Sequence, residues 1–308
     1  MKAMCANKRN QISSQDVVVM TLNQGKQGPE YRREENTKKE SIKKESDQQQ
    51  VISKKKRKCN RVIGLGQKVL HDERRMKQGG IIKSGNSWFI TEYDRGYAIF
   101  EILDNPGKID FSDPQTIHTL SFPFTGYNHA YSHANNTIYY ISEDGSFISS
   151  YNTKTQKGMG HRKINSLINR NIYYQIEGSS ALHYSENHLW LIYNRDEHNH
   201  LTVSRLEPKT LKEIKTIRLN KFDRPIRNTF ITCGILYAID CEGYKCRVLP
   251  IFDLIRNKYV MKKENFLLRG GNHWTSYGNI TSLTYDSISR KLGVLDDGKI
   301  YSVQVNIE

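Results

Sequence analysis

His188–Tyr193 (HLWLIY) and Leu201–Leu206 (LTVSRL) are two short runs of apolar and β-branched residues, and the polar interval 194–200 separates them. Two such runs around a polar turn are typical of a β-hairpin. The pattern occurs three more times, and we predict hairpins at 137–142 with 146–151, 235–240 with 247–253, and 292–296 with 299–305. The sequence contains no clear helical pattern longer than two turns, so we expect an all-β fold from Arg61 onward.

The spacing of these hairpins bears on the architecture. The second strands of three hairpins end at Tyr151, Leu206 and Phe252, at intervals of 55 and 46 residues. A four-stranded propeller blade has about 40–50 residues. The residues alone are compatible with a β-sandwich or a β-propeller, and the recurring unit favours a propeller of five or six blades.

Positive charge is concentrated near the N-terminus. The 308 residues carry a formal net charge of +15, and residues 1–58 hold 15 Lys/Arg against 7 Asp/Glu. Arg32–Gln50 has almost no apolar side chain, so it cannot bury enough surface to offset chain entropy. We expect a disordered basic segment over residues 1–58 and a folded domain over residues 59–308. Such charge favours acidic partners, although it also serves solubility alone.

Lys54–Lys58 (KKKRK) is a compact basic run at the predicted boundary between these two parts. Three interpretations stay open: a nuclear import signal, a convertase cleavage site and a solvated charge run. Nucleic-acid-binding modules usually interleave aromatic and basic residues, and residues 32–58 contain no aromatic residue. We therefore expect no nucleic-acid partner.

The ends of the chain and its hydropathy bear on location. No apolar run of about 18 residues exists, so we expect no membrane span. The start, MKAMCANKR, lacks the apolar region of a secretory signal peptide. This feature alone indicates the cytoplasm, which conflicts with the location expected below. An incomplete N-terminus would resolve the conflict.

The chain has an odd number of cysteines and two glycosylation sequons. The five cysteines are Cys5, Cys59, Cys233, Cys241 and Cys246. They form no Cys-x-x-Cys pair, so we expect no zinc ribbon. Cys241 and Cys246 flank a hairpin turn, and we expect them to form a disulfide. The sequons make Asn135 and Asn279 candidate glycosylation sites.

Motifs for catalysis or cofactor binding are missing. The sequence has no His-Glu-x-x-His, Gly-x-Ser-x-Gly or phosphate-loop pattern. His198 and His200 lie in a predicted turn, where solvated side chains are a better interpretation than metal ligands. Asp296 and Asp297 are adjacent carboxylates beside Gly298, and we assign them to the turn. We expect no enzyme activity and no cofactor.

The three tryptophans lie in or beside apolar stretches. Core packing is the default role for Trp88, Trp190 and Trp274. Trp274 follows a Gly-Gly-Asn-His run, so a surface aromatic patch is the alternative for this residue.

Three stretches resemble the olfactomedin family. Residues 189–193 with 201–211 are similar to the family's LWVIY … VVSKLNPETL, and residues 228–237 (NTFITCGILY) are similar to NAFIICGTLY. Residues 283–298 (LTYDSISRKLGVLDDG) are similar to IDYNPxxKKLYAWDNG. The order and spacing of the three motifs also match, so the chain is identified as a member of this family.

The resemblance implies a fold and a function. It implies a secreted, extracellular, five-bladed β-propeller that binds proteins without catalysis, in cell adhesion, matrix or synapse organisation and signalling. The expected partners are cell-surface or matrix proteins, with acidic glycans as a further class. Coiled-coil and collagen segments are not evident, so we expect a monomer. The alternatives are a propeller-fold hydrolase and a nuclear protein imported through the basic run.

The resemblance also implies one disulfide and one metal site. The family's cysteine pair corresponds to Cys59 and Cys233. Many family members hold a buried calcium ion in the central channel. The matching ligand positions are Ala181, Asn228 and Thr284, so both carboxylates are replaced and only the amide is retained. Calcium needs several oxygen ligands, usually including carboxylates. We therefore predict that this chain lacks the site, with a water cluster or a polar network around Asn228 in its place.

Overall fold

A computed structural model describes residues 61–104, 109–165, 171–174, 176, 178–195, 200–220, 226–260 and 273–308. The chain divides into two units, Met1–Lys56 and Arg57–Glu308. All described residues belong to the second unit. The disorder predicted for residues 1–58 lies outside the described residues.

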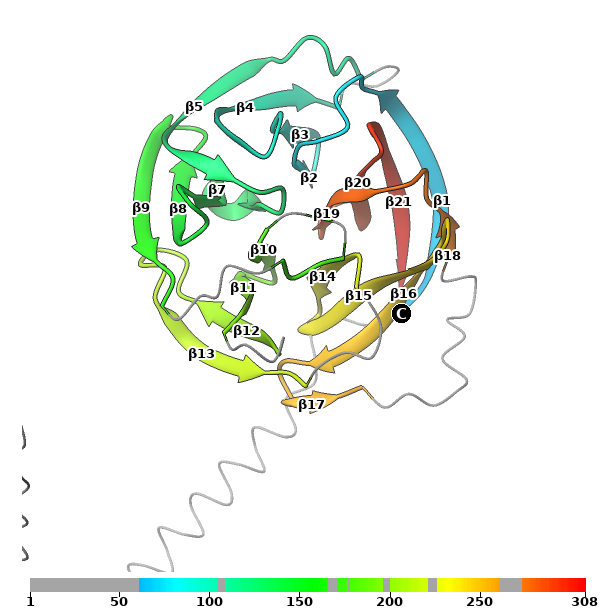
Figure 1. Ribbon diagram of the computed structural model, residues 1–308. Helices are drawn as coiled ribbons and strands as arrows, with labels where there is room; N and C mark the ends of the chain where they lie inside the picture. The colour runs from blue at the N-terminus through cyan, green and yellow to red at the C-terminus, as the bar shows by residue number, and fades with distance from the viewer. Residues whose placement is uncertain are drawn as a thin grey trace, which may run out of the picture. The chain divides into compact units, whose positions relative to one another are not determined.

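The described strands form a five-bladed β-propeller, as predicted (Figure 1). From the inner to the outer strand, blade 1 contains β2 (Ile81–Ser84), β3 (Ser87–Ile90), β4 (Arg95–Leu103) and β5 (Thr116–Thr125). Blade 2 contains β6 (Ala130–Ser132), β7 (Thr137–Ser142), β8 (Phe147–Asn152) and β9 (Lys157–Lys163), with the short 3₁₀ helix η1 (His133–Asn135) after β6. Blade 3 contains β10 (Ser180–Ser185), β11 (His188–Asn194), β12 (Leu201–Leu206) and β13 (Glu213–Arg218).

Blades 4 and 5 complete the ring. Blade 4 contains β14 (Asn228–Thr232), β15 (Ile235–Glu242), β16 (Lys245–Asp253) and β17 (Lys258–Tyr259), and β18 (His273–Thr275) also pairs with β16. Blade 5 contains β19 (Ile280–Asp286), β20 (Lys291–Asp296), β21 (Lys299–Ile307) and β1 (Val62–Glu73). The sheets are antiparallel, and blades 1 and 2 are joined into one sheet through the pair Phe124–Ser142.

The ring is closed by strands from opposite ends of the domain. β1 pairs antiparallel with β21, from Val62 opposite Ile307 to Glu73 opposite Lys299. The Lys299 ammonium lies 2.6 Å from the Glu73 carboxylate. The first described strand is therefore the outer strand of the last blade.

All four hairpins predicted from the sequence are present, as β7–β8, β11–β12, β15–β16 and β20–β21. The tight turn between β20 and β21 places Asp297 at φ 51° and Gly298 at φ 86°. Both values lie in the left-handed region that two-residue hairpin turns use. A Cβ on Gly298 would lie 2.6 Å from the carbonyl oxygen of Arg74, so this position requires glycine.

Apolar side chains fill the spaces between the blades. The described tryptophans are all buried, with Trp88, Trp190 and Trp274 exposing 0%, 5% and 6% of their surface. Each packs in an apolar cluster. The prediction of core packing is therefore confirmed for all three, and Trp274 does not form a surface patch.

Candidate functional site

The inner strands β2, β6, β10, β14 and β19 surround the axis of the propeller (Figure 1). Asn228, at the start of β14, is fully buried there. Its amide oxygen accepts a hydrogen bond from the Thr229 backbone N–H at 2.8 Å. Its amide nitrogen donates to the side-chain oxygen of Asn128 at 3.3 Å. Neighbouring protein groups therefore already engage both ends of the retained amide.

The hydrogen-bond network continues through Thr229. Its hydroxyl lies 2.5 Å from the Tyr173 hydroxyl and 2.9 Å from Nε2 of His183. The two positions at which the family has carboxylate ligands hold Thr284 and Ala181 in this chain. The Thr284 hydroxyl accepts a hydrogen bond from the Lys83 backbone N–H at 3.1 Å, and Ala181 packs in an apolar cluster. A polar network thus surrounds Asn228.

Two histidines lie at the axis, and both are kept neutral by burial. Burial lowers the pKa of His129 to about 4 and that of His183 to about 3, because a charged imidazolium is poorly solvated in the interior. Both side chains line a small cavity of about 20 Å³ together with Lys83 and Thr284. A cavity of this size holds about one water molecule.

The residues around Asn228 do not fit a calcium ion. Calcium takes six to eight oxygen ligands and favours carboxylates, whereas amide and hydroxyl groups that already form hydrogen bonds occupy these positions. Asp286, the nearest substitute in sequence, binds the backbone N–H groups of Gly85 at 2.9 Å and Ile288 at 3.0 Å. Among the described residues, no group of three His, Cys, Asp or Glu side chains could hold a metal. The absence of calcium remains a prediction.

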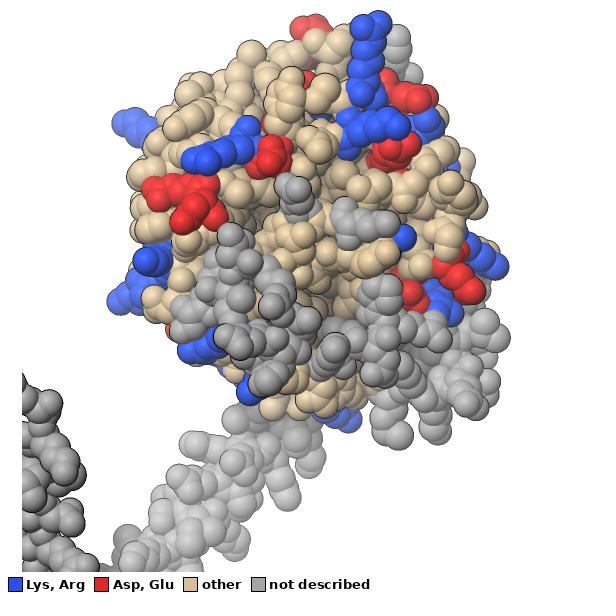
Figure 2. Space-filling view, in the orientation of Figure 1, with Lys and Arg blue, Asp and Glu red and all other residues tan. Residues whose placement is uncertain are grey.

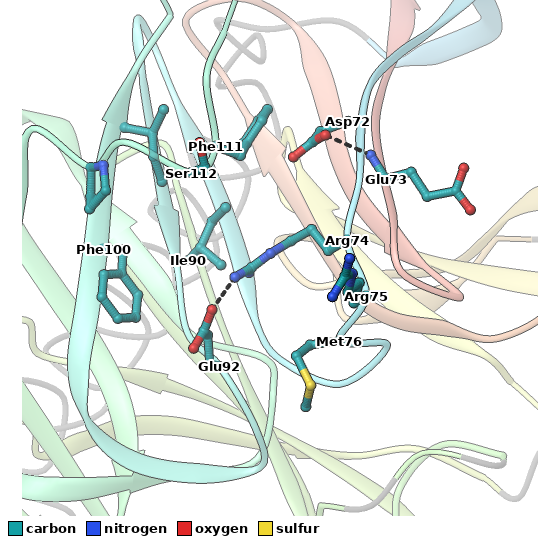
Figure 3. Close-up of a pocket in the computed structure, with 12 residues that line it drawn as sticks. Asp72, Glu73, Arg74, Arg75, Met76, Ile90, Glu92, Phe100, Phe111 and Ser112 are labelled. Carbon is teal, nitrogen blue, oxygen red and sulfur yellow. Dashed lines mark hydrogen bonds and ion pairs between the residues drawn. The ribbon is translucent and has the colours of Figure 1, made fainter.

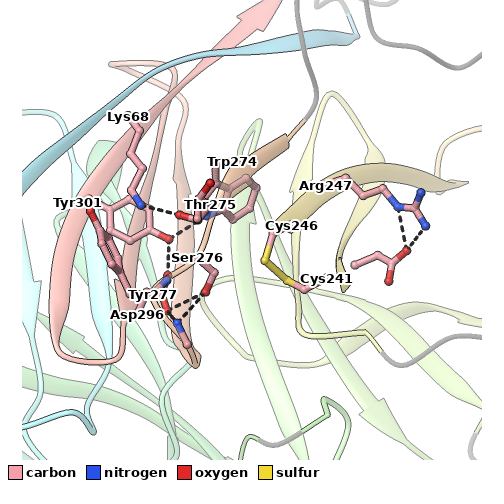
Figure 4. Close-up of a disulfide and its surroundings, with 12 residues drawn as sticks. Lys68, Cys241, Cys246, Arg247, Trp274, Thr275, Ser276, Tyr277, Asp296 and Tyr301 are labelled. Atoms are coloured by element: carbon pink, nitrogen blue, oxygen red, sulfur yellow. Dashed lines mark hydrogen bonds and ion pairs between the residues drawn. A yellow bond between two sulfur atoms is a disulfide. The ribbon is translucent and has the colours of Figure 1, made fainter. Parts of the chain in front are cut away.

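The β15–β16 hairpin carries a disulfide at its end (Figure 4). Cys241 and Cys246 are cross-strand partners with Cα atoms 4.0 Å apart, and their sulfur atoms are bonded. The turn between them is exposed, and Tyr244 at its tip exposes 65% of its surface. This hairpin therefore presents an aromatic side chain on a cross-linked loop, which is a feature that suits a contact surface.

A buried carboxylate lies near this hairpin (Figure 4). Asp296 accepts hydrogen bonds from the Ser276 hydroxyl at 2.9 Å, the Tyr277 N–H at 2.8 Å, the Gly278 N–H at 3.1 Å and the Tyr301 hydroxyl at 2.8 Å. We predicted a turn role for both adjacent aspartates. That prediction is wrong for Asp296, which is fully buried. Three of its four donors belong to Ser276, Tyr277 and Gly278, which lie 18 to 20 positions earlier, so adjacency to the turn did not reveal the role.

A lysine of β1 binds the same cluster. Lys68 Nζ lies 3.7 Å from the ring centre of Tyr277 and 4.2 Å from that of Tyr301, and it donates a hydrogen bond to the Thr275 carbonyl at 2.7 Å. Burial lowers the pKa of Lys68. These contacts hold β1, and hence the ring closure, to the last blade. The sequence contained no signal for them.

A larger pocket lies between β1 and blade 1 (Figure 3). Its volume is about 610 Å³. Its apolar lining comes from Ile90, Phe100, Ile102 and Phe111. Its charged lining comes from Asp72, Glu73, Arg74, Arg75 and Glu92, and Arg74 pairs with Glu92 across it. An apolar floor with a charged rim suits an apolar side chain of a protein partner.

Blade 2 contains an arrangement that resembles a catalytic triad. The Ser149 hydroxyl lies 2.8 Å from Nδ1 of His161, whose Nε2 lies 3.4 Å from the Glu143 carboxylate. Ser149 exposes only 1% of its surface, and the rings of Phe122 and Phe147 stack on the imidazole at 3.9 and 4.5 Å. A substrate cannot reach this hydroxyl, so the arrangement stabilises the blade.

Some of the remaining predicted site residues lie among the described residues, and others lie outside them. Cys233 is buried and takes part in a disulfide, but Cys59 lies outside the described residues, so their pairing remains a proposal. Asn135 is exposed in η1, whereas Asn279 is half-buried. His200 accepts a hydrogen bond from Arg218 at 2.8 Å. Cys5, His198 and the Lys54–Lys58 run lie outside the described residues.

The olfactomedin-like domain model matches residues 54–308. The chain therefore belongs to the olfactomedin-like family, whose domain is typically a non-catalytic, extracellular protein-interaction module. A disulfide is also consistent with extracellular proteins. No helix among the described residues is long and apolar enough to cross a membrane.

Two solved structures show a distant similarity. The WD40 domain of coronin from Toxoplasma gondii is 9% identical with a TM-score of 0.38, over 74% of this chain and 56% of that one. Hydrazine synthase from Kuenenia stuttgartiensis is 12% identical with a TM-score of 0.41, over 73% of this chain and 56% of that one. The chain thus spans just over half the length of either matched structure.

Proposed function

We propose that this protein is an extracellular, non-catalytic binding module that acts in cell adhesion, matrix or synapse organisation and signalling. Membership of the olfactomedin-like family carries this proposal. A five-bladed propeller with short hairpin loops is a rigid scaffold, and rigid scaffolds position variable surface loops for binding. The partners are cell-surface or matrix proteins, and the propeller itself is a monomer.

The pocket between β1 and blade 1 is the proposed anchor site for a protein partner. It offers about 610 Å³ above buried apolar side chains, including Ile90 and Ile102. Apolar side chains that fill such pockets usually provide most of the binding energy of a protein interface. The Arg74–Glu92 pair at its edge would then orient polar groups of the partner.

A binding screen tests this function. The full chain, expressed with a secretion signal, is screened against a panel of cell-surface and matrix proteins treated to remove their glycans. We expect at least one partner. Ser112→Tyr, an exposed position on the pocket lining, should abolish that binding by filling the mouth. Ser121→Tyr, an exposed position on β5 away from the pocket, is the matched control. Absence of any partner would overturn the proposal.

The extracellular location has its own test. We propose that Cys59 pairs with Cys233 and that Asn135 and Asn279 are glycosylation sites of the secreted protein. The Cys59–Cys233 loop would stabilise the domain by roughly 5 kcal/mol at most in the chain-entropy model. Non-reducing peptide mapping should find the linked pair, and glycosidase treatment should shift the mass at Asn135. Two free thiols in the secreted protein would contradict the pairing.

A further inference from the structure

The positive charge of the propeller domain is concentrated on one part of its outer edge. Two segments, 152–163 with β9 and 205–218 with β13, form this part, and we call them together the basic edge. They hold nine Lys/Arg against two Asp/Glu, a surplus of seven. Residues 59–308 as a whole hold 32 against 25, also a surplus of seven. The remainder of the domain is therefore electrically balanced, and the basic edge carries its entire net charge.

We propose that the basic edge is a binding site for a sulphated glycosaminoglycan. This inference rests on the proposed extracellular function, because such polymers occur at cell surfaces and in the matrix. It specifies where the acidic partner binds and which residues contact it.

The lysines of the basic edge are available to a ligand. The six lysines are all exposed: Lys154, Lys157, Lys163, Lys209, Lys212 and Lys215. None of them forms an ion pair with any described residue. The two acidic residues are occupied by neutral donors. Glu207 accepts the Thr210 N–H at 2.6 Å, and Glu213 accepts the Ser204 hydroxyl at 3.0 Å. The six lysines are therefore not held in ion pairs with described residues, so a ligand can contact them.

The two segments form one continuous surface. β9 and β13 are the outer strands of consecutive blades (Figure 1). Leu211, in the turn before β13, packs so closely on β9 that a Cβ on Gly160 would lie 3.3 Å from its methyl group. Lys209 and Lys212 flank Leu211 in sequence, so this contact brings them beside β9. Blue side chains gather along the corresponding lower-left edge of Figure 2.

The shape of the basic edge favours a linear polyanion over an acidic protein. β9 has seven residues, so it extends about 23 Å, and lysines occupy both of its ends. Protein interfaces depend on aromatic or arginine anchors in buried pockets. The large exposed apolar side chains of the basic edge are Met159 and Ile214, and neither is aromatic. A row of exposed point charges instead matches the regularly spaced sulphates of a glycan chain.

Heparin binding by the full chain tests this inference. Because Lys54–Lys58 would bind heparin independently, all five residues are changed to Gln in every protein compared. In this background, one variant changes Lys154, Lys157, Lys209 and Lys212 to Gln together. We expect the dissociation constant for heparin to rise about tenfold or more. The magnitude of the slope of log affinity against log salt concentration should decrease by about three units. Each lysine that binds the polyanion releases a counterion, and the variant makes fewer such contacts.

A matched control separates the site from net charge. Arg95→Gln, Lys245→Gln, Lys258→Gln and Arg290→Gln remove four exposed cations outside the basic edge and outside the proposed anchor pocket. We expect this variant to bind heparin within about twofold of the background protein. Equal losses in the two variants would overturn the inference, because net charge alone would then explain binding. Absence of heparin binding, or equally tight binding of desulphated heparin or polyglutamate, would also overturn it. A protein partner found in the glycan-free screen would leave the proposed function intact in each case.

Discussion

The central channel and the cluster around Asp296 both bury polar side chains, but only the second buries a carboxylate. In the channel, Asn228 and Thr229 form hydrogen bonds with neutral groups, and burial holds His129 and His183 uncharged. In the last blade, four donors converge on Asp296.

This difference follows from the cost of burying charge. An ionised carboxylate is tolerated in the interior only where enough donors replace its hydration. Residues 276–278 and the Tyr301 hydroxyl supply those donors beside blade 5, whereas Ala181 and Thr284 occupy the family's two carboxylate positions in the channel. The groups that bind Asn228 are thus neutral, the nearby buried Lys83 is paired with Asp104 at 3.0 Å, and the closing blade buries the Asp296 carboxylate.

The largest expected effect is a loss of unfolding free energy in acid, caused by the two buried histidines of the channel. An unfolded histidine has a pKa near 6.5, whereas His129 and His183 titrate at about 4 and about 3 when folded. Between these values the unfolded chain binds more protons, so the free energy of unfolding falls as pH falls below 6.5. The two groups together should contribute a slope of about 2–3 kcal/mol per pH unit between pH 6 and 4. Denaturant unfolding across this pH range measures the slope.

Histidine variants test whether His129 and His183 cause this pH dependence of the unfolding free energy. His129→Gln and His183→Gln should each remove about half of it, whatever their effect on absolute stability. His133→Gln changes an exposed histidine in η1 and serves as the control. An unchanged slope in both channel variants would contradict the assignment of neutral, buried imidazoles.

Two neighbouring aspartates allow a sharp test of the second region. Asp296→Asn replaces an acceptor oxygen with a donor that faces existing donors, so we expect a loss of about 3–4 kcal/mol in unfolding free energy. Asp297→Asn keeps a residue that tolerates the left-handed turn and removes only the half-exposed pair with Lys77, so its loss should stay below about 1 kcal/mol. Equal losses in the two variants would contradict the structural distinction between the two carboxylates.

The hairpin disulfide should have a smaller effect on the same blade region. Cys246 pairs with Trp274, whose indole donates a hydrogen bond to Tyr301, so the disulfide supports one side of the Asp296 cluster. Its loop is short, and the chain-entropy model gives roughly 2 kcal/mol for such a loop. Cys241→Ser should lower stability by about that amount and make Cys246 reactive to alkylation after denaturation. Unchanged labelling of Cys246 would count against the bridge.

The sequence predicted the hairpins well because their information is local. Alternating apolar residues and Asp-Gly turns define β20 and β21 without reference to the rest of the chain. The spacing of the second strands also indicated blades. The family resemblance then supplied the number of blades.

The polar clusters could not be predicted in the same way because they are assembled from distant segments. Lys68 meets Tyr277 and Tyr301 only after β1 has closed the ring. Asp296 was assigned to a turn because its neighbours Asp297 and Gly298 form one. The buried state of His129 depends on packing between blades, which no local pattern encodes.

The most direct test of the neutral channel is thermal unfolding of the full chain in millimolar calcium and in excess chelator. The amide of Asn228 is already hydrogen bonded, and Ala181 and Thr284 offer no carboxylate. We therefore predict the same unfolding midpoint in both conditions. A bound ion of useful affinity would stabilise the folded state by linkage, by about 2.7 kcal/mol at a hundredfold excess over its dissociation constant. A clear rise of the midpoint in calcium, absent in magnesium at the same concentration, would contradict the account.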